Sequence, residues 1–278
     1  MVLSQNAAPT ADDLALAHRL ADAAGAAIRP LFRGDWESER KADKSPVTEA
    51  DRAAEAAIRA ILEKERPEDG ILGEEYGLTR ENSGRRWVLD PIDGTISFMA
   101  GRPIFGTLIA LMQDGWPVLG VIDQPVARER WAGMLGQGTT FNGKPVTTRT
   151  CPTLDGAVLA TSSPHYFGRE EADGYMKLAG AVGGNARQAT IVYGGDCYNY
   201  GLLASGHLDV VCEAGMAIHD YAALVPVVEG AGGTMSDWQG NPLDADSDGT
   251  VLALGDPARL DDVLEAMGDP AVSHSHGH

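Results

Sequence analysis

Two aspartates stand three residues apart in the stretch WVLDPIDGTISF, which runs from Trp87 to Phe98. The apolar residues before Asp90 predict a short buried strand, and we expect Pro91 to end it because proline cannot donate a ladder hydrogen bond. Asp90 and Asp93 are then expected on a turn, where both carboxylates can converge on one point. Such oxygen ligands suit a hard divalent cation such as Mg²⁺.

The next two residues, Gly94 and Thr95, stand at the start of a predicted short helix. The first turn of a helix leaves backbone N–H groups without partners, and these groups attract phosphate. A metal pair beside a phosphate cradle is the layout of a metal-assisted phosphatase. Taken alone, the hexapeptide DPIDGT is equally consistent with an ordinary turn, because aspartate, proline and glycine are common turn formers.

Three other segments carry acids or hydroxyls that could join this chemistry. Glu74 and Glu75 follow an apolar pair and a glycine, and on an extended segment only one of them would face the site. Thr48 and Asp51 fit the start of an alanine-rich helix, where the hydroxyl would act as a cap. Asp220 precedes an apolar helix, and by itself it is better explained as an N-cap than as a metal ligand.

In their order along the chain, these segments resemble the motifs of the inositol monophosphatase superfamily: a Gly-Glu-Glu, an Asp-Pro-Ile-Asp-Gly-Thr and a Trp-Asp before a helix. The resemblance extends from Leu14 to Leu264. Within the superfamily the sequence is most similar to bacterial histidinol-phosphate phosphatases, through segments 101–110, 118–125 and 194–200. The resemblance implies a layered α/β fold of the inositol monophosphatase and fructose-bisphosphatase type, an αβαβα sandwich, and a homodimer.

The resemblance also implies a role for each matching position. Two or three Mg²⁺ ions would be held by Glu74, Asp90, the Ile92 carbonyl, Asp93 and Asp220. The catalytic set would be Thr95 and Asp51, which orient the attacking water, together with Glu74. The substrate contacts would be Gly94, Thr95, Lys44, Asp196, Glu213 and Asp220.

The identity of the substrate depends on acids that the metals do not use. Asp196 and Glu213 match positions that contact the alcohol in relatives, and an acid at Asp196 favours a cationic leaving group. A loop carboxylate satisfied after two glycines explains Asp196 equally well. We therefore expect a Mg²⁺-dependent hydrolase of L-histidinol phosphate in histidine biosynthesis. The alternatives are an inositol monophosphatase or broad-specificity phosphatase, and a non-catalytic interaction protein on the same scaffold.

His219 departs from the family pattern, which carries an aromatic residue before the helix aspartate. We expect its ring to pack as the ring it replaces would. If it instead reached the metals, it would favour softer divalent ions.

The amino-acid composition argues against several classes of protein. A net charge of −18 argues against a nucleic-acid surface, which needs a basic patch. Three cysteines without metal-ligand spacing predict reduced thiols. No signal peptide is indicated in residues 1–10, and no apolar run is long enough to span a bilayer. We expect a cytoplasmic enzyme whose partner is a small phosphate monoester, with neither nucleic acid nor membrane bound.

Hydrophobic periodicity predicts the helices and strands that carry the candidate site residues. It predicts helices over 11–32, 48–64, 169–181, 199–205, 221–229 and 257–267. It predicts strands over 106–113, 117–124, 129–135, 157–161, 188–192, 207–212 and 250–253, with a hairpin turn at Asn142-Gly143. We expect an α+β half over 1–147 with most metal ligands, an α/β half over 148–268 with Asp220 and substrate contacts, and a disordered tail over 269–278.

Overall fold

The computed structural model describes residues 8–34, 38–40, 46–183 and 190–268. Its largest sheet has eight strands in the order β10-β9-β8-β7-β6-β5-β3-β4. These strands are β3 (Gly70–Gly73), β4 (Gly77–Thr79), β5 (Arg85–Asp93), β6 (Gly106–Gln113), β7 (Trp116–Gln124), β8 (Glu129–Met134), β9 (Gly138–Phe141) and β10 (Lys144–Val146). All neighbours are antiparallel except β3 and β5.

A second sheet follows with the order β12-β11-β13-β15-β14. Its strands are β11 (Leu159–Thr161), β12 (Ile191–Tyr193), β13 (Val210–Glu213), β14 (Thr234–Ser236) and β15 (Val251–Leu254). The chain passes from the first sheet to the second between β10 and β11. A two-stranded ribbon, β1 (Ser38–Arg40) and β2 (Pro46–Thr48), precedes both.

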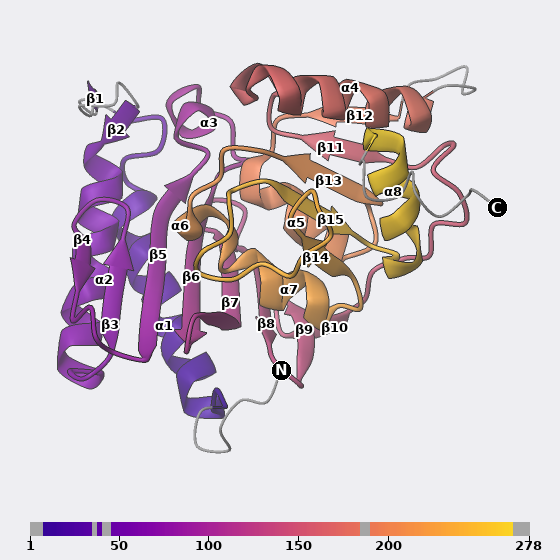
Figure 1. Cartoon of the computed structure of the whole chain (residues 1–278). Coiled ribbons are helices and arrows are strands. Elements are labelled where there is room, and N and C mark those ends of the chain that lie inside the picture. The colour runs from indigo at the N-terminus through magenta and orange to yellow at the C-terminus, as the bar shows by residue number, and fades with distance from the viewer. Residues whose placement is uncertain (1–7, 35–37, 41–45, 184–189, 269–278) are drawn as a thin grey trace.

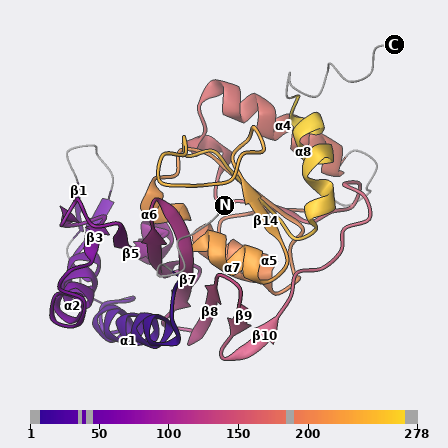
Figure 2. The same cartoon turned by 60° about the horizontal axis from the view of Figure 1, so that its bottom comes forward.

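Helices form three layers around the two sheets (Figures 1 and 2). Helices α1 (Ala11–Ile28) and α2 (Glu49–Glu65) cover one face of the large sheet. Helices α5 (Asp196–Ala204) and α7 (Leu224–Gly230) lie between the sheets, and α4 (Arg169–Gly183) and α8 (Leu260–Met267) cover the outer face of the second sheet. The described residues also form two short helices, α3 (Thr95–Met99) and α6 (Ile218–Tyr221), and two 3-10 turns, Pro164–Tyr166 and Pro257–Arg259. The predicted αβαβα layering is confirmed.

Strand β6 shows why this layering follows from the sequence. All eight of its residues are buried, because both faces of the strand are covered. Leu108 and Ala110 face the core shared with α5 and α7, whereas Ile109 and Leu111 face α1 and α2. The two sheets therefore share one apolar layer. Among the residues that the structure describes, every helix is too short or too polar to span a bilayer.

Strand β5 differs from the prediction at Pro91. The strand does not stop there but continues to Asp93, and its register shifts between Asp90 paired with Leu108 and Asp93 paired with Gly106. A bulge accommodates proline because the residues inside it make no regular ladder bond. The expected turn at Asp90 and Asp93 is therefore wrong: a bulge in a strand brings the two acids together.

The predicted helix over 221–229 is in fact two helices, α6 and α7, with a turn at 222–223. Pro226 explains the break, because it has no N–H to donate to the Ala222 carbonyl four residues earlier. Asp220 is consequently the third residue of α6 and not its N-cap. Glu74 and Glu75 also differ from expectation, since they lie in the β3–β4 turn and not on an extended segment.

Other helices and strands begin or end a few residues away from their predicted bounds. The first helix ends at Ile28, and 29–34 form turns. The strand expected from residue 207 begins at Val210, and the last predicted helix starts with a 3-10 turn. Part of the strand expected over 188–192 and all of the tail over 269–278 lie outside the described residues.

Candidate active site

Three carboxylates converge where the two sheets face each other. One oxygen from each of Asp90, Asp93 and Asp220 lies within 4.8 Å of the other two. The first two belong to the β5 bulge, and the third comes from the first turn of α6. Packing of α6 on β5 therefore joins acids that are far apart in the sequence.

Backbone donors hold each carboxylate in place. The N–H of Ile92 donates to Asp90 (3.0 Å), that of Cys197 to Asp93 (2.6 Å) and that of Ala217 to Asp220 (2.7 Å). Because the donors are backbone groups of rigid elements, the orientation of the acids is set before any ligand arrives. Metal sites depend on such supporting contacts to orient their ligands.

The cluster is electrostatically unfavourable without a cation. Burial, followed by the charges of Glu74 and Asp93, raises the pKa of Asp90 well above its ordinary value. Burial and the charges of Asp196 and Asp220 do the same to the pKa of Asp93. Like charges so close in a desolvated site need a compensating positive charge. The donor set therefore fits a hard divalent cation such as Mg²⁺.

Glu74 lies beside this trio but outside its tight cluster. Its N–H donates to the Leu89 carbonyl (3.2 Å), which ties the β3–β4 turn to the residue before Asp90. The turn is also held by buried Glu55 of α2, which accepts the N–H groups of Glu75 and Tyr76. Glu74 shares a cavity of ≈ 390 Å³ with Gly94, Thr95, Asp196 and Asp220. The structure thus gathers five of the predicted site residues around one space.

Thr95 and Gly94 occupy the start of α3, as predicted. The Thr95 hydroxyl donates to the Ile92 carbonyl (3.1 Å), so the predicted water-orienting group and the predicted metal-binding carbonyl are in contact. Gly94 has a φ of 87°, and a Cβ there would lie 2.6 Å from Asp196 Oδ2. Glycine is required at this position for both reasons. Asp51 is buried at the start of α2, and its charge contributes to the raised pKa of Asp90.

A neighbouring cavity of ≈ 220 Å³ contains the acids that were expected to select the substrate. Asp196 and Glu213 line it together with Asp93 and Asp220. Asp196 accepts a hydrogen bond from Ser97 (3.2 Å), and burial raises its pKa. The two acids therefore open onto the same space as two of the metal-cluster carboxylates.

Glu213 is held by hydroxyl and backbone donors. It accepts bonds from the Ser162 N–H (2.5 Å) and hydroxyl (2.7 Å) and from the Thr161 hydroxyl (3.3 Å). Burial raises its pKa to about 7, although these hydrogen bonds act in the opposite direction. Glu213 is therefore an acid that changes charge near neutral pH.

His219 contacts the cluster through its neighbour. Its Nε2 lies 3.4 Å from Asp220 Oδ1, and the side chain is 22% exposed. Its positive charge when protonated lowers the pKa of Asp220, against the larger effect of burial. The ring therefore does more than fill an aromatic position, although the three-carboxylate group does not include it.

Several lining residues were not identified from the sequence. Ser97, Ser162 and Tyr166 line the two cavities, and Arg102 lies against Gly194 at the rim. Single serines and an arginine carry no pattern that marks them. Two predicted positions, Lys44 and the Thr48 side chain, lie outside the described residues.

Comparison with known proteins agrees with this geometry. Residues 11–267 match the model of the inositol monophosphatase family. The chain is 45% identical over 262 residues to the bifunctional phosphatase IMPL2 of Arabidopsis thaliana, a chloroplastic protein, covering 91% of this chain and 74% of that protein. It is 40% identical over 245 residues to a histidinol-phosphatase of Streptomyces coelicolor, covering 83% and 88%. The solved structure of an inositol monophosphatase from Zymomonas mobilis is 54% identical, with a TM-score of 0.84 over 93% of this chain and 99% of that one.

Proposed function

Since the chain belongs to the inositol monophosphatase family, we propose that it is a Mg²⁺-dependent phosphatase that hydrolyses L-histidinol phosphate. Family membership and the acidic cluster establish the coarser function, a metal-dependent phosphomonoesterase. The observation that carries the finer proposal is the cavity in which Asp196 and Glu213 accompany Asp93 and Asp220. Two acids beyond those of the metal cluster suit a leaving group that carries positive charge.

In this proposal one group of residues binds the metal ions and the phosphate, and a second group binds the alcohol. Glu74, Asp90, Asp93, Asp220 and the Ile92 carbonyl hold the metal ions. Bound Mg²⁺ would supply a water of lowered pKa and neutralise charge on the phosphoryl group. Thr95 and Asp51 orient the attacking water, and Gly94 leaves room for the phosphate.

The second group recognises the alcohol. In their ionised forms, Asp196 and Glu213 attract the ammonium group of histidinol, and the positive charge of that group favours their ionisation. A neutral polyol offers them no charge to pair with. Tyr166, which lines both cavities, supplies an aromatic surface at the rim. The proposal is supported by the similarity to proteins named histidinol-phosphatase at 37–40% identity.

Inositol monophosphate is the second candidate substrate, favoured by the 54% identity to the Zymomonas mobilis structure. The decisive experiment measures kcat/KM for L-histidinol phosphate and inositol 1-phosphate side by side with Mg²⁺. We expect the wild-type protein to prefer histidinol phosphate. A preference for inositol 1-phosphate would overturn the assignment while leaving the phosphatase intact.

An Asp196→Asn variant tests whether the charge of Asp196 recognises the substrate. Asparagine tolerates the left-handed backbone of this residue (φ 42°), so the substitution removes only the charge. Losing one charge-assisted contact should lower kcat/KM for histidinol phosphate by roughly 10-fold to 100-fold. The value for inositol 1-phosphate should change little. Asp173→Asn, an exposed acid on α4, is the matched control. Equal losses on both substrates would show that Asp196 does not recognise the cation.

A homodimer, a cytoplasmic location and two or three Mg²⁺ ions per site remain predictions from the family resemblance. Sedimentation of the full chain would test the first of these.

A further inference from the structure

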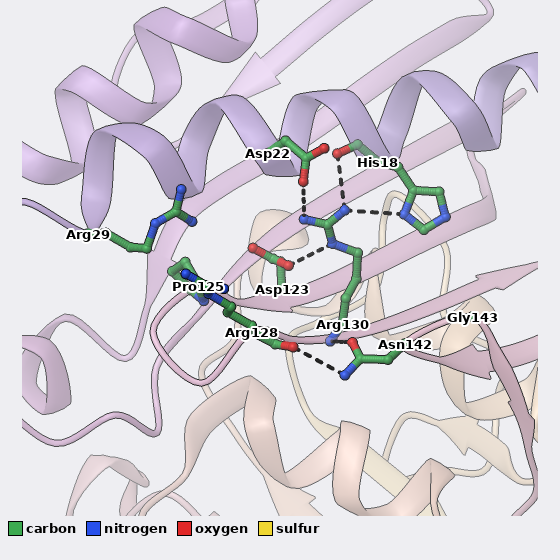
Figure 3. Close-up of a pocket in the computed structure, with 9 residues that line it drawn as sticks. All are labelled: His18, Asp22, Arg29, Asp123, Pro125, Arg128, Arg130, Asn142 and Gly143. Carbon is green, nitrogen blue, oxygen red and sulfur yellow. Dashed lines mark hydrogen bonds and ion pairs between the residues drawn. The ribbon is translucent and has the colours of Figure 1, made fainter.

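A third and larger cavity lies on the α1 side of the large sheet. It measures ≈ 560 Å³, within the range of small-molecule sites. We name it the arginine cavity after three of its charged lining residues, Arg29, Arg128 and Arg130, which it combines with Asp22 and Asp123 (Figure 3). Three guanidinium groups against two carboxylates leave its charged lining net positive, in a chain whose net charge is −18.

Arg130 uses its donors within the protein. It donates to Asp123 (2.7 Å), to Asp22 (2.8 Å) and to the His18 carbonyl (3.2 Å). Figure 3 shows its side chain reaching from β8 to α1 between these partners. Arg130 thereby offsets the two carboxylates and joins α1 to the sheet.

Arg29 and Arg128 are different, because within the described ranges no acidic side chain forms an ion pair with either. The charge of Arg29 nevertheless acts to lower the pKa of Asp123. Arg29 lies at the end of α1, directly over Gly25. A Cβ at Gly25 would lie 2.7 Å from an Arg29 guanidinium nitrogen and 3.1 Å from Pro125 Cβ. Glycine inside a helix costs about 1 kcal/mol relative to alanine, and here it makes space for the arginine.

Arg128 is placed by a turn that its neighbours hold rigidly. The buried Gln124 side chain accepts the N–H groups of Val126 (2.8 Å) and Ala127 (2.6 Å). Arg128 itself has a φ of 59°, an uncommon conformation for a residue with a side chain. Its carbonyl accepts a bond from the Asn142 amide (3.1 Å), which ties the turn to the β9–β10 hairpin. Backbone strain of this kind is retained where surrounding contacts enforce it.

We propose that the arginine cavity binds a small organic anion through Arg29 and Arg128. The ligand class is a metabolite that carries a phosphate or carboxylate group, because guanidinium forks match the geometry of both.

The cavity lies close to the backbone of the candidate active site. Asp123 is paired with Thr107 in the adjacent strand, and the Thr107 hydroxyl donates to the Pro91 carbonyl (2.7 Å). Pro91 lies in the bulge that carries Asp90 and Asp93. Only one strand therefore separates the cavity wall from the backbone of the metal ligands.

The test is calorimetric titration of the full-length protein in EDTA with inorganic phosphate and, separately, with malonate. Removing the metals keeps this binding distinct from phosphatase turnover, so the two proposals can fail independently. We expect one saturable site for at least one of the two anions, and the preferred anion identifies the group that the cavity recognises. Absence of saturable binding for both anions would overturn the proposal.

Substitutions at the arginine cavity test whether the anion binds there. Replacing both Arg29 and Arg128 by glutamine should raise the Kd at least 10-fold. Gly25→Ala, which displaces Arg29 without removing charge, should raise it at least 3-fold. Arg169→Gln, an exposed arginine on α4, is the matched control and should bind as the wild type does. Unchanged affinity in the double variant would also overturn the proposal.

Discussion

Burial of the Glu213 carboxylate has a cost in stability that depends on pH. Its carboxylate is buried beneath Ser162 and Thr161, whose hydrogen bonds do not fully offset the loss of water, and its pKa rises to about 7. An acid whose folded pKa exceeds its unfolded value makes the folded state less stable as pH rises from the unfolded pKa to the folded one. The contribution of its protonated form to stability is fully present only below the ordinary pKa of about 4.5, and it is lost as pH rises through about 7.

Glu213→Gln should therefore stabilise the protein at alkaline pH. Relative to wild type, the free energy of unfolding of the variant should increase by about 2 to 3 kcal/mol between pH 5 and pH 8. Urea denaturation in EDTA across this range measures the difference. Glu63→Gln, an exposed acid on α2, should show no such pH dependence. A parallel pair of pH profiles for Glu213→Gln and wild type would contradict the raised pKa.

At the scale of elements, the contact of α7 with β7 joins the two sheets. A Cβ at Gly120 of β7 would lie 1.9 Å from the carbonyl oxygen of Ala223, just before α7. The helix can approach the strand this closely only because the residue has no side chain. The same packing positions α6, which carries Asp220.

Gly120→Ala should consequently force α7 away from the sheet. Overpacking of this kind costs about 1 to 3 kcal/mol, and we expect the upper part of that range because the obstructing atom is backbone. Thermal and urea unfolding measure the loss, and Mg²⁺-dependent turnover should fall with it. Gly180→Ala in α4, where a Cβ would meet nothing within 4 Å, should instead stabilise by about 0.5 to 1 kcal/mol. Similar effects of the two substitutions would refute the close-contact argument.

At the scale of the whole molecule, we expect the acidic cluster to make the stability of the fold depend on cations. Asp90, Asp93, Asp220 and Glu74 repel one another across the junction of the two sheets, as their effects on the pKa values show. A cation that binds the folded protein and not the unfolded chain removes this repulsion and adds its binding free energy to stability.

Mg²⁺ should therefore raise the melting temperature of the metal-free protein. At 100 times the Kd the gain is about 2.7 kcal/mol, and for a chain of this size that corresponds to roughly 5 °C. Differential scanning calorimetry with and without Mg²⁺ measures it. Asp93→Asn keeps an acceptor for the Cys197 N–H, should abolish turnover and should lose most of the Mg²⁺ effect. An equal rise in both proteins would remove Asp93 from the metal site.

The sequence by itself was sufficient where structure is decided locally. The unbroken apolar run of β6 predicted its bounds of Gly106–Gln113, and Asn142-Gly143 predicted the β9–β10 hairpin, whose two residues have φ values of 48° and 76°. The types and order of the acids likewise pointed to metal-assisted phosphate chemistry. Side-chain chemistry and local backbone preference act over a few residues, so they can be identified without knowing the fold.

Only the tertiary structure decided how the acids are held and what surrounds them. The bulge at Pro91 depends on pairing with β6, and the bond from the Cys197 N–H to Asp93 joins residues 104 positions apart. The ion pair of Arg130 with Asp22 likewise requires α1 to lie on the large sheet. Such contacts depend on which elements pack together, and that packing is set by burial across the whole chain and not by any short stretch of it.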